Sequence, residues 1–225
     1  MIFLQKYFPF NVRMYFIKGN IEELVSIFVN WLTNIEANSN KILTEHYHEN
    51  LNVSIPRLLP FTTAEERRHI FVQLDDNWTF YLSNFMLGTD NSVPYFVSEQ
   101  LKTSCLGIIY DTNSKFIELL SWSNVTRSFE LERFVGYHTE ISKTEFMSQG
   151  QALPFERTDL FVKRKIKERF TDESIIAFLE GMIIPINFSD DTIVRDTFFV
   201  YKKGKMWPST KEYSWESALR NYYSK

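Results

Sequence analysis

Glycine is scarce in this chain, with only 7 among 225 residues. Flexible Gly-rich linkers and the glycine loops that hold phosphate groups are therefore largely excluded. There is a single cysteine, Cys105, so an intramolecular disulfide framework is excluded as well. Because Cys105 stands in an apolar run over residues 105–109, we expect a buried, unreactive thiol in a reducing compartment such as the cytoplasm.

Neither sign of charge dominates, because 25 Lys and Arg stand against 28 Asp and Glu and give a net charge of −3. Nucleic-acid binding needs a concentrated basic surface, so we expect no nucleic-acid partner. No stretch approaches the ~18 uncharged apolar residues of a membrane-spanning helix. The apolar start of the chain is interrupted by Lys6, Pro9, Asn11 and Arg13, unlike a secretory signal. The sequence therefore predicts a soluble, cytoplasmic protein without a membrane partner.

The short motifs of the commoner enzyme classes are also missing. The chain has no G-x-S-x-G elbow, no P-loop, no H-E-x-x-H helix, no C-x-x-C pair and no Gly-rich dinucleotide fingerprint. These absences favour a non-enzymatic protein without a cofactor, although catalysis does not require any one of these motifs.

The composition is that of a folded protein with many aromatic side chains. Hydrophobic residues make up 44% and charged residues 24% of the chain, which includes 21 Phe, 11 Tyr and 5 Trp. A length of 225 residues is enough to bury a substantial core. Because the chain has no repeat, low-complexity tract or clear linker, we predict one domain over residues 1–225.

The first part of the chain predicts alternating strands and helices. A strand over residues 12–17 precedes a helix that Asn20 caps and that runs to about residue 37. The apolar stripe of this helix recurs every three or four residues: Ile21, Leu24, Val25, Phe28, Trp31, Leu32 and Ile35. Short strands are expected at residues 41–47 and 51–55, and a helical turn at 62–66. The apolar runs 70–74 and 78–85 around a polar turn predict a β-hairpin.

The later part predicts more strands and then helices. A helix over residues 93–101, capped by Asp90 or Ser92, is followed by strands at 105–110, 116–122, 129–137 and 146–153. Helices are then expected from Thr158 or Asp159 to Phe170, over residues 171–181 and over residues 214–223, with a late strand at 193–201. Together these elements predict an α+β fold with a central, mostly antiparallel sheet, packing helices and a helical C-terminal third.

Two stretches together resemble a family of uncharacterised bacterial proteins. Trp78-Thr79, Asn84 and Gly88-Thr89-Asp90, followed by a helix and then Cys105 and Gly107, form the pattern W-T-(x)4-N-(x)3-G-T-D-helix-C-x-G. Those proteins also carry an Arg-Phe-Thr sequence, here residues 169–171, before a helix and a G-(x)2-I-P element, here residues 181–185. The resemblance covers roughly a third of the chain. It implies a bacterial origin and a shared fold, and no activity.

The sequence Glu-His-Tyr-His-Glu at residues 45–49 is a candidate metal site. On a strand, His46 and His48 point to the same face, where both imidazoles could bind one metal ion. A third ligand has to come from elsewhere, for example His69 or His138. The polar residues that follow favour an exposed loop with solvated side chains, so no metal site is predicted.

A second candidate is the loop of residues 88–91. A strand of eight residues spans roughly 25 Å, so Asp75 and Asp90 fall at opposite ends of the predicted hairpin and cannot form a catalytic carboxylate pair. Turn formation and helix capping explain these two side chains. The loop of residues 88–91 remains a candidate anion site, because it precedes a helix N-terminus. The predicted binding residues are Trp78, Asn84, Gly88, Thr89 and Asp90.

A third candidate is the basic run at residues 163–169, on the solvent face of the predicted helix. A solvated face is the simpler interpretation, and a docking surface for an acidic protein is the alternative. The predicted docking residues are Lys163, Arg164 and Lys167. Nucleic acid would require aromatic side chains on that face, whereas Phe161 and Phe170 are assigned to the core.

Three functional hypotheses follow from these patterns. The first is a non-enzymatic bacterial protein-binding domain, in the concrete form of an immunity protein that neutralises a cognate toxin through an aromatic-rich surface. The second is a small-molecule or anion-binding enzyme with a pocket near residues 88–91. The third is a subunit of a phage or secretion assembly. The partner in the first and third is another protein.

Overall fold

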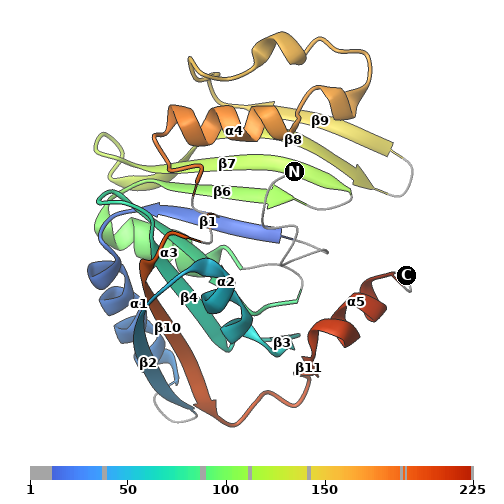
Figure 1. Cartoon of the computed structure of the whole chain (residues 1–225). Coiled ribbons are helices and arrows are strands. Elements are labelled where there is room, and N and C mark those ends of the chain that lie inside the picture. The colour runs from blue at the N-terminus through green and yellow to red at the C-terminus, as the bar shows by residue number, and fades with distance from the viewer. Residues whose placement is uncertain are drawn as a thin grey trace.

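The computed structural model describes residues 12–36, 40–86, 90–110, 113–140, 143–187, 190 and 192–223. Its centre is a nine-stranded sheet in the order β2-β10-β4-β5-β1-β6-β7-β8-β9, in which neighbouring strands are antiparallel (Figure 1). The strands are β1 (Val12–Lys18), β2 (Asn40–Glu49), β4 (Arg68–Gln73), β5 (Trp78–Ser83), β6 (Cys105–Tyr110), β7 (Ser114–Ser123), β8 (Ser128–Glu140), β9 (Lys143–Gln149) and β10 (Arg195–Gly204). The predicted antiparallel α+β architecture is confirmed.

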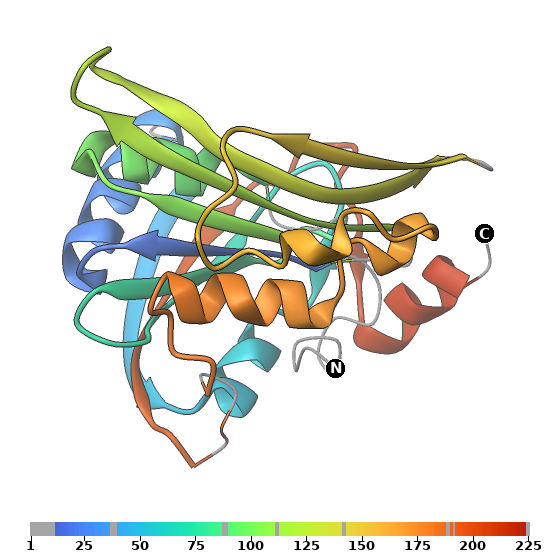
Figure 2. The same cartoon turned by 90° about the horizontal axis from the view of Figure 1, so that it is seen from above.

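Helices cover both faces of this sheet (Figure 2). They are α1 (Ile21–Glu36), α2 (Leu51–Ser54), α3 (Ser92–Leu101), α4 (Asp172–Gly181) and α5 (Trp215–Tyr223), with 3₁₀ turns η2 (Ile55–Leu58), η3 (Thr158–Leu160) and η4 (Ile166–Glu168). A two-stranded ribbon of β3 (Phe61–Thr62) and β11 (Glu212–Tyr213) is separate from the main sheet. Helices α1 and α3 lie on one face, and α2, α4 and α5 contribute to the core on the other.

Strand β1 shows how one strand serves both cores. Successive side chains of a strand point to opposite faces, so Met14 and Phe16 enter the core that α4 covers, while Tyr15 and Ile17 enter the core under α1. All four are at most 1% exposed. A strand buried on both faces reads as a continuous apolar run rather than an alternating one, which is why β5 and β6 stand out in the sequence.

The predicted β-hairpin is confirmed as β4 and β5. The Asp75 carboxylate accepts hydrogen bonds from the backbone N–H groups of Asn77 (2.9 Å) and Trp78 (2.8 Å) and so closes the turn. Asp90 lies at the other end of the hairpin, where its backbone N–H donates to Glu66, two residues before β4. The expected separation of Asp75 from Asp90 is therefore confirmed.

Two short predicted elements are wrong. Residues 51–55 form α2 and the start of η2 instead of a strand, because Asn50 caps α2 by accepting a hydrogen bond from the Val53 N–H (3.2 Å) and Pro56 fits the first turn of η2. Residues 62–66 form no helical turn, because Thr62 pairs with Glu212 in the small ribbon and its carbonyl accepts the Met86 N–H (2.8 Å).

The C-terminal third is not predominantly helical, contrary to the prediction. Residues 158–170 contain only η3 and η4, although Val162, Ile166 and Phe170 recur every four residues. A helix would place like charges at i,i+4, Lys163 with Lys167 and Lys165 with Arg169, and these pairs oppose it. The late strand, β10, is ten residues long and pairs with β2 on one side and β4 on the other. No helix among the residues that the structure describes is long and apolar enough to cross a membrane.

A buried ion pair fastens the irregular segment after β9 to the sheet. Arg133 on β8 is 1% exposed and donates from Nε and Nη2 to the two carboxylate oxygens of Glu156, both at 2.7 Å. Its Nη1 donates to the carbonyl of Gln149 (2.7 Å) and to Ser148 Oγ (3.0 Å). Glu156 in turn accepts from the Leu153 N–H (2.8 Å). This bidentate ion pair anchors the segment after β9, for which a helix was predicted.

Candidate functional site

A pocket of about 270 Å³ lies on the sheet face covered by α1 and α3, beside the C-terminal half of α1. Its walls are mainly apolar and aromatic, with side chains from α1, from residues 85 and 93 and from the loop after β10: Phe28, Trp31, Leu32, Ile35, Phe85, Val93 and Trp207. Its polar lining comes from Glu36, Glu65, Glu66, His69, Asp90, Ser92 and Lys202. An apolar cavity with a few convergent polar groups is the usual form of a small-molecule site.

The loop that carries Trp207 is held in place by a buried ion pair between Glu65 and Arg67. The Arg67 guanidinium donates to Glu65 Oε1 (3.0 Å) and to the carbonyls of Lys202 (3.0 Å) and Lys205 (3.2 Å). Glu65 Oε1 also accepts the Trp207 backbone N–H at 3.0 Å. Trp207 itself lines the pocket and is 54% exposed, so it forms an outer wall.

Glu66 is the central ionisable group of the pocket. Its Oε1 accepts hydrogen bonds from Ser83 Oγ and from the Asp90 backbone N–H (2.7 Å), and its side chain is 12% exposed. Burial disfavours the charged carboxylate and raises the pKa of Glu66 to about 7, against the lowering effect of the two hydrogen bonds. Glu66 therefore exchanges its proton near neutral pH.

His69 lies beside Glu66 and is neutral at pH 7. The side chain is 2% exposed, and burial lowers the pKa of His69 well below its ordinary value. Its Nδ1 is 2.9 Å from the Tyr81 hydroxyl, and its ring centroid is 4.8 Å from that of Phe28. Its Nε2 is buried without a hydrogen-bond partner among the described residues. Burial and the nearby Glu66 carboxylate raise the pKa of Tyr81, so the phenol keeps its proton.

Two of the carboxylates that line the pocket are already neutralised. Glu36 pairs with Lys202 Nζ at 2.9 Å, and Glu65 pairs with Arg67 at 3.0 Å. Both members of each pair have side chains at most 10% exposed, so these charges are compensated within the protein.

The predicted binding residues are divided by the structure. Asp90 lines the pocket. Asn84 does not, because its amide is used to position the chain before β4: Oδ1 accepts from the N–H groups of Arg67 (2.9 Å) and Arg68 (3.0 Å), and Nδ2 donates to the Pro60 carbonyl (2.8 Å). Trp78 is 3% exposed in the core on the opposite face of the sheet. Gly88 and Thr89 lie outside the described residues.

His46 and His48 do share one face of β2, as the sequence predicts. His46 Nε2 is 3.1 Å and His48 Nδ1 is 3.3 Å from the same oxygen of Asp196 on β10, and the three side chains are 50%, 71% and 53% exposed. The other two histidines lie elsewhere, His69 in the pocket and His138 against Ser114. Within the described ranges, no group of three or more His, Cys, Asp or Glu side chains could hold a metal ion.

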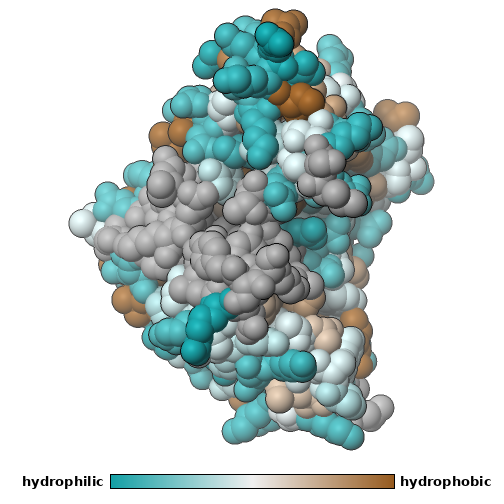
Figure 3. Space-filling model, turned by 90° about the vertical axis from the view of Figure 1, so that its right-hand side faces the viewer, coloured by the Kyte–Doolittle hydropathy of each residue, from teal (hydrophilic) through white to brown (hydrophobic). Residues whose placement is uncertain are grey.

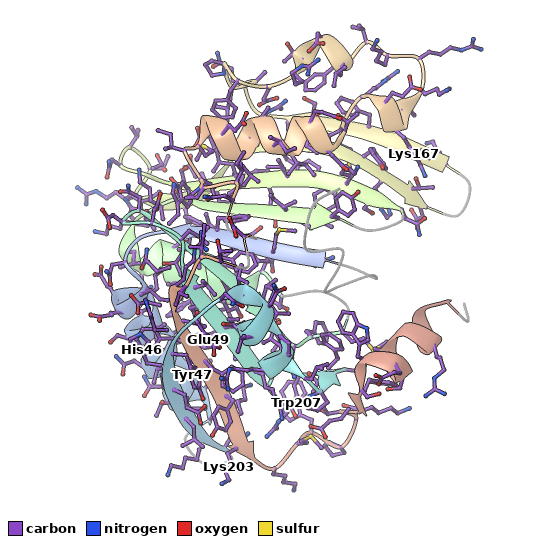
Figure 4. All side chains as sticks on the ribbon, viewed as in Figure 1. His46, Tyr47, Glu49, Lys167, Lys203 and Trp207 are labelled. Atoms are coloured by element: carbon purple, nitrogen blue, oxygen red, sulfur yellow. The ribbon has the colours of Figure 1, made fainter. Side chains whose placement is uncertain are left out.

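The predicted docking residues Lys163, Arg164 and Lys167 are all exposed, although they lie on an irregular segment instead of a helix. Lys167 Nζ lies 6.0 Å from the centroid of the Tyr137 ring, and Figure 4 shows it at the end of the molecule where this segment packs. Val162, next to the basic run, is 86% exposed. Figure 3 shows that this end of the molecule, at the top of the view, is mainly hydrophilic with separate hydrophobic residues.

Sequence reasoning missed Glu66, Lys202 and Trp207 and considered His69 only as a metal ligand. The one local signal is the pair Glu65-Glu66 just before an apolar strand, where two adjacent carboxylates are unusual at the edge of a core. The chain matches no protein-family model, no curated protein and no solved structure.

Proposed function

We propose that the protein binds a small organic molecule in the pocket beside α1, a refinement of the second hypothesis from the sequence. The observation that carries the proposal is the combination of aromatic walls with buried ionisable side chains whose hydrogen-bonding capacity is unfilled. His69 Nε2, at a residue that lines the pocket, has no hydrogen-bond partner among the described residues. A buried polar atom of this kind is costly unless a ligand or water satisfies it.

The pocket supports a neutral or cationic ligand better than the anion first considered. Glu36 and Glu65 on its walls have cationic partners, Lys202 and Arg67, whereas Glu66 and Asp90 form no ion pair with Lys or Arg among the described residues. A carboxyl group with a pKa of about 7, such as that of Glu66, is also suited to transfer a proton at neutral pH. We therefore predict that Glu66 can act as a general acid or base toward the bound molecule.

Replacing Trp207 with alanine is expected to weaken binding of a small aromatic ligand about tenfold, because one aromatic wall contributes roughly 1–1.5 kcal/mol. The measurement is a thermal-shift screen of small aromatic compounds, followed by titration calorimetry on those that raise the Tm of the wild type. Trp207 is 54% exposed, so the substitution leaves the core intact.

Met206→Ala is the matched control, since Met206 lies in the same loop, is 37% exposed and does not line the pocket. It should keep the wild-type affinity. A screen in which no compound raises the Tm would contradict the proposal. Equal affinities for wild type and Trp207→Ala would contradict it as well.

Protein binding, the first hypothesis, is a second candidate because of the exposed basic segment. Exchanging Lys163 and Arg164 for glutamate is expected to lower affinity for an acidic protein partner at least about tenfold, since it reverses the charge beside the exposed Val162. The measurement is co-purification with the product of a neighbouring toxin-like gene. Exposed Lys18 and Lys41, exchanged in the same way, control for net charge.

Equal loss of the partner in both double variants would show a nonspecific charge effect and remove this candidate. The immunity role, the assembly-subunit alternative and the cytoplasmic location stay predictions. A stable homo- or hetero-oligomer in light scattering is the result expected for an assembly subunit.

A further inference from the structure

We infer that the ligand of the pocket is a small organic cation, an ammonium group carried on an apolar ring system. The inference rests on the proposed function and specifies its ligand. Three independent features of the pocket carry it: an uncompensated buried carboxyl group, buried atoms that can only accept hydrogen bonds, and aromatic walls.

The first feature is the charge balance around Glu66. The carboxylates of Glu36 and Glu65 have cationic partners, whereas the hydrogen bonds that Glu66 accepts come from neutral donors, Ser83 and the Asp90 backbone. The nearest basic group in an ion-pair geometry is His69 Nδ1, 3.9 Å from Glu66 Oε2, and His69 is neutral. A buried carboxylate without a cation is unfavourable, so a bound ammonium group supplies the missing charge.

The second feature is the protonation pattern of the neighbouring side chains. Tyr81 has one proton, and its hydrogen bond to Glu66 contributes to the raised pKa of the phenol. When the Tyr81 proton is directed at Glu66, His69 Nδ1 donates to the Tyr81 hydroxyl at 2.9 Å and Nε2 is an acceptor. Glu65 Oε2 is likewise buried without a partner among the described residues. Both unfilled atoms need a donor, and an ammonium group has N–H donors and no acceptor.

The third feature is the aromatic surround. Phe28, Trp31, Phe85 and Trp207 line the pocket, and the faces of aromatic rings attract organic cations. The volume of about 270 Å³ lies just below the roughly 300–1,000 Å³ of pockets for drug-sized ligands, so the ligand has one or two rings. The exposed Asp90 carboxylate near the pocket adds to the attraction for a cation.

The test compares amines with alcohols of the same shape. The probes are 2-phenylethylamine and tryptamine, each paired with its alcohol, 2-phenylethanol and tryptophol, in titration calorimetry at pH 8. We expect each amine to bind at least about tenfold more tightly than its alcohol. The affinity of the amines should fall about tenfold from pH 8 to pH 6 as Glu66, with a pKa of about 7, takes up a proton, while the alcohols show no such change.

Several charged or titratable groups face Glu66 and belong in this comparison: His69 on β4, Tyr81 on β5, Lys202 on β10 and Asp90 before α3. Glu66→Gln is expected to remove both the preference for amines and its pH dependence while alcohol binding persists. Asp90→Asn, at an exposed position, should weaken amine binding a few-fold. The exposed Glu99→Gln on α3 is the control and should behave as wild type.

Equal binding of amine and alcohol, or an amine preference that survives Glu66→Gln, would overturn the inference and leave small-molecule binding intact. If none of the four probes binds at millimolar concentration but other compounds bind, the cation inference fails and the proposed small-molecule binding stands. If no compound binds at all, both proposals fail. Circular dichroism checks whether Glu66→Gln is folded. If the variant is unfolded, the pH dependence of amine affinity in the wild type tests the inference.

Discussion

Replacement of Arg133 by alanine is expected to lower the free energy of unfolding by about 3–5 kcal/mol. The Arg133 guanidinium holds both oxygens of Glu156 at 2.7 Å, and both side chains are 1% exposed. Removing Arg133 leaves the Glu156 carboxylate buried without its cation and the Gln149 carbonyl without its donor. The measurement is urea denaturation followed by circular dichroism, with the midpoint and slope compared at constant pH.

Arg157→Ala provides the matched control. Arg157 also donates to a carboxylate, that of Asp159 at 3.0 Å, but the two side chains are 47% and 62% exposed. An exposed pair of this kind contributes about 0–1 kcal/mol, so a small change is expected. The double variant Arg133→Met with Glu156→Leu should recover most of the stability lost in Arg133→Ala, because it removes the unpaired charge. A loss below about 1 kcal/mol in Arg133→Ala would contradict the assignment of this pair as the anchor of the segment.

Glu66→Gln is expected to raise the free energy of unfolding at pH 8 by up to about 3 kcal/mol relative to wild type. Burial raises the pKa of Glu66 from 4.5 to about 7, so the folded protein binds this proton more tightly than the unfolded chain does. The stabilisation from protonated Glu66 is fully present below pH 4.5 and is lost as the pH rises through about 7. Glutamine keeps the volume and is neutral at every pH, so the gain grows with pH.

Urea denaturation of wild type and Glu66→Gln at half-unit steps from pH 5 to pH 8 measures this difference. Other titrating groups contribute equally to both proteins, so the difference between the two curves isolates Glu66. The exposed Glu99→Gln, measured in the same way, is the control for the loss of one carboxylate. A constant difference for Glu66→Gln would show that Glu66 is ionised in the folded protein at every pH tested, and the amine proposal would lose its pH signature.

Local patterns predict the parts of the fold in which short-range interactions decide the structure. The apolar stripe of α1 buries Leu24, Phe28 and Leu32 as its spacing indicates, and Asp75 closes the β4–β5 turn through its own backbone neighbours. The runs that became β5 and β6 are apolar at nearly every position because both faces are buried.

The same patterns fail where one sequence satisfies two periodicities. Leu51, Val53 and Ile55 alternate as in a strand, yet Leu51, Ile55 and Leu58 also recur at helical spacing, and the Asn50 cap favours the helical form. Over residues 158–170 the apolar spacing predicts a helix that does not form, because the same spacing pairs like charges at i,i+4. The Arg133–Glu156 pair and the buried Phe170 hold the irregular segment in place.

The sequence by itself determined the mostly antiparallel sheet, the α1 helix and the hairpin, because hydrophobic periodicity and turn chemistry act over a few residues. Only the tertiary structure decided the pocket. It brings together α1, residues 64–69, Asp90 and residues 202–207, and the last of these reach the site because β10 pairs with β4. The raised pKa of Glu66 and the unfilled Nε2 of His69 follow from burial by those distant segments, which no local pattern encodes.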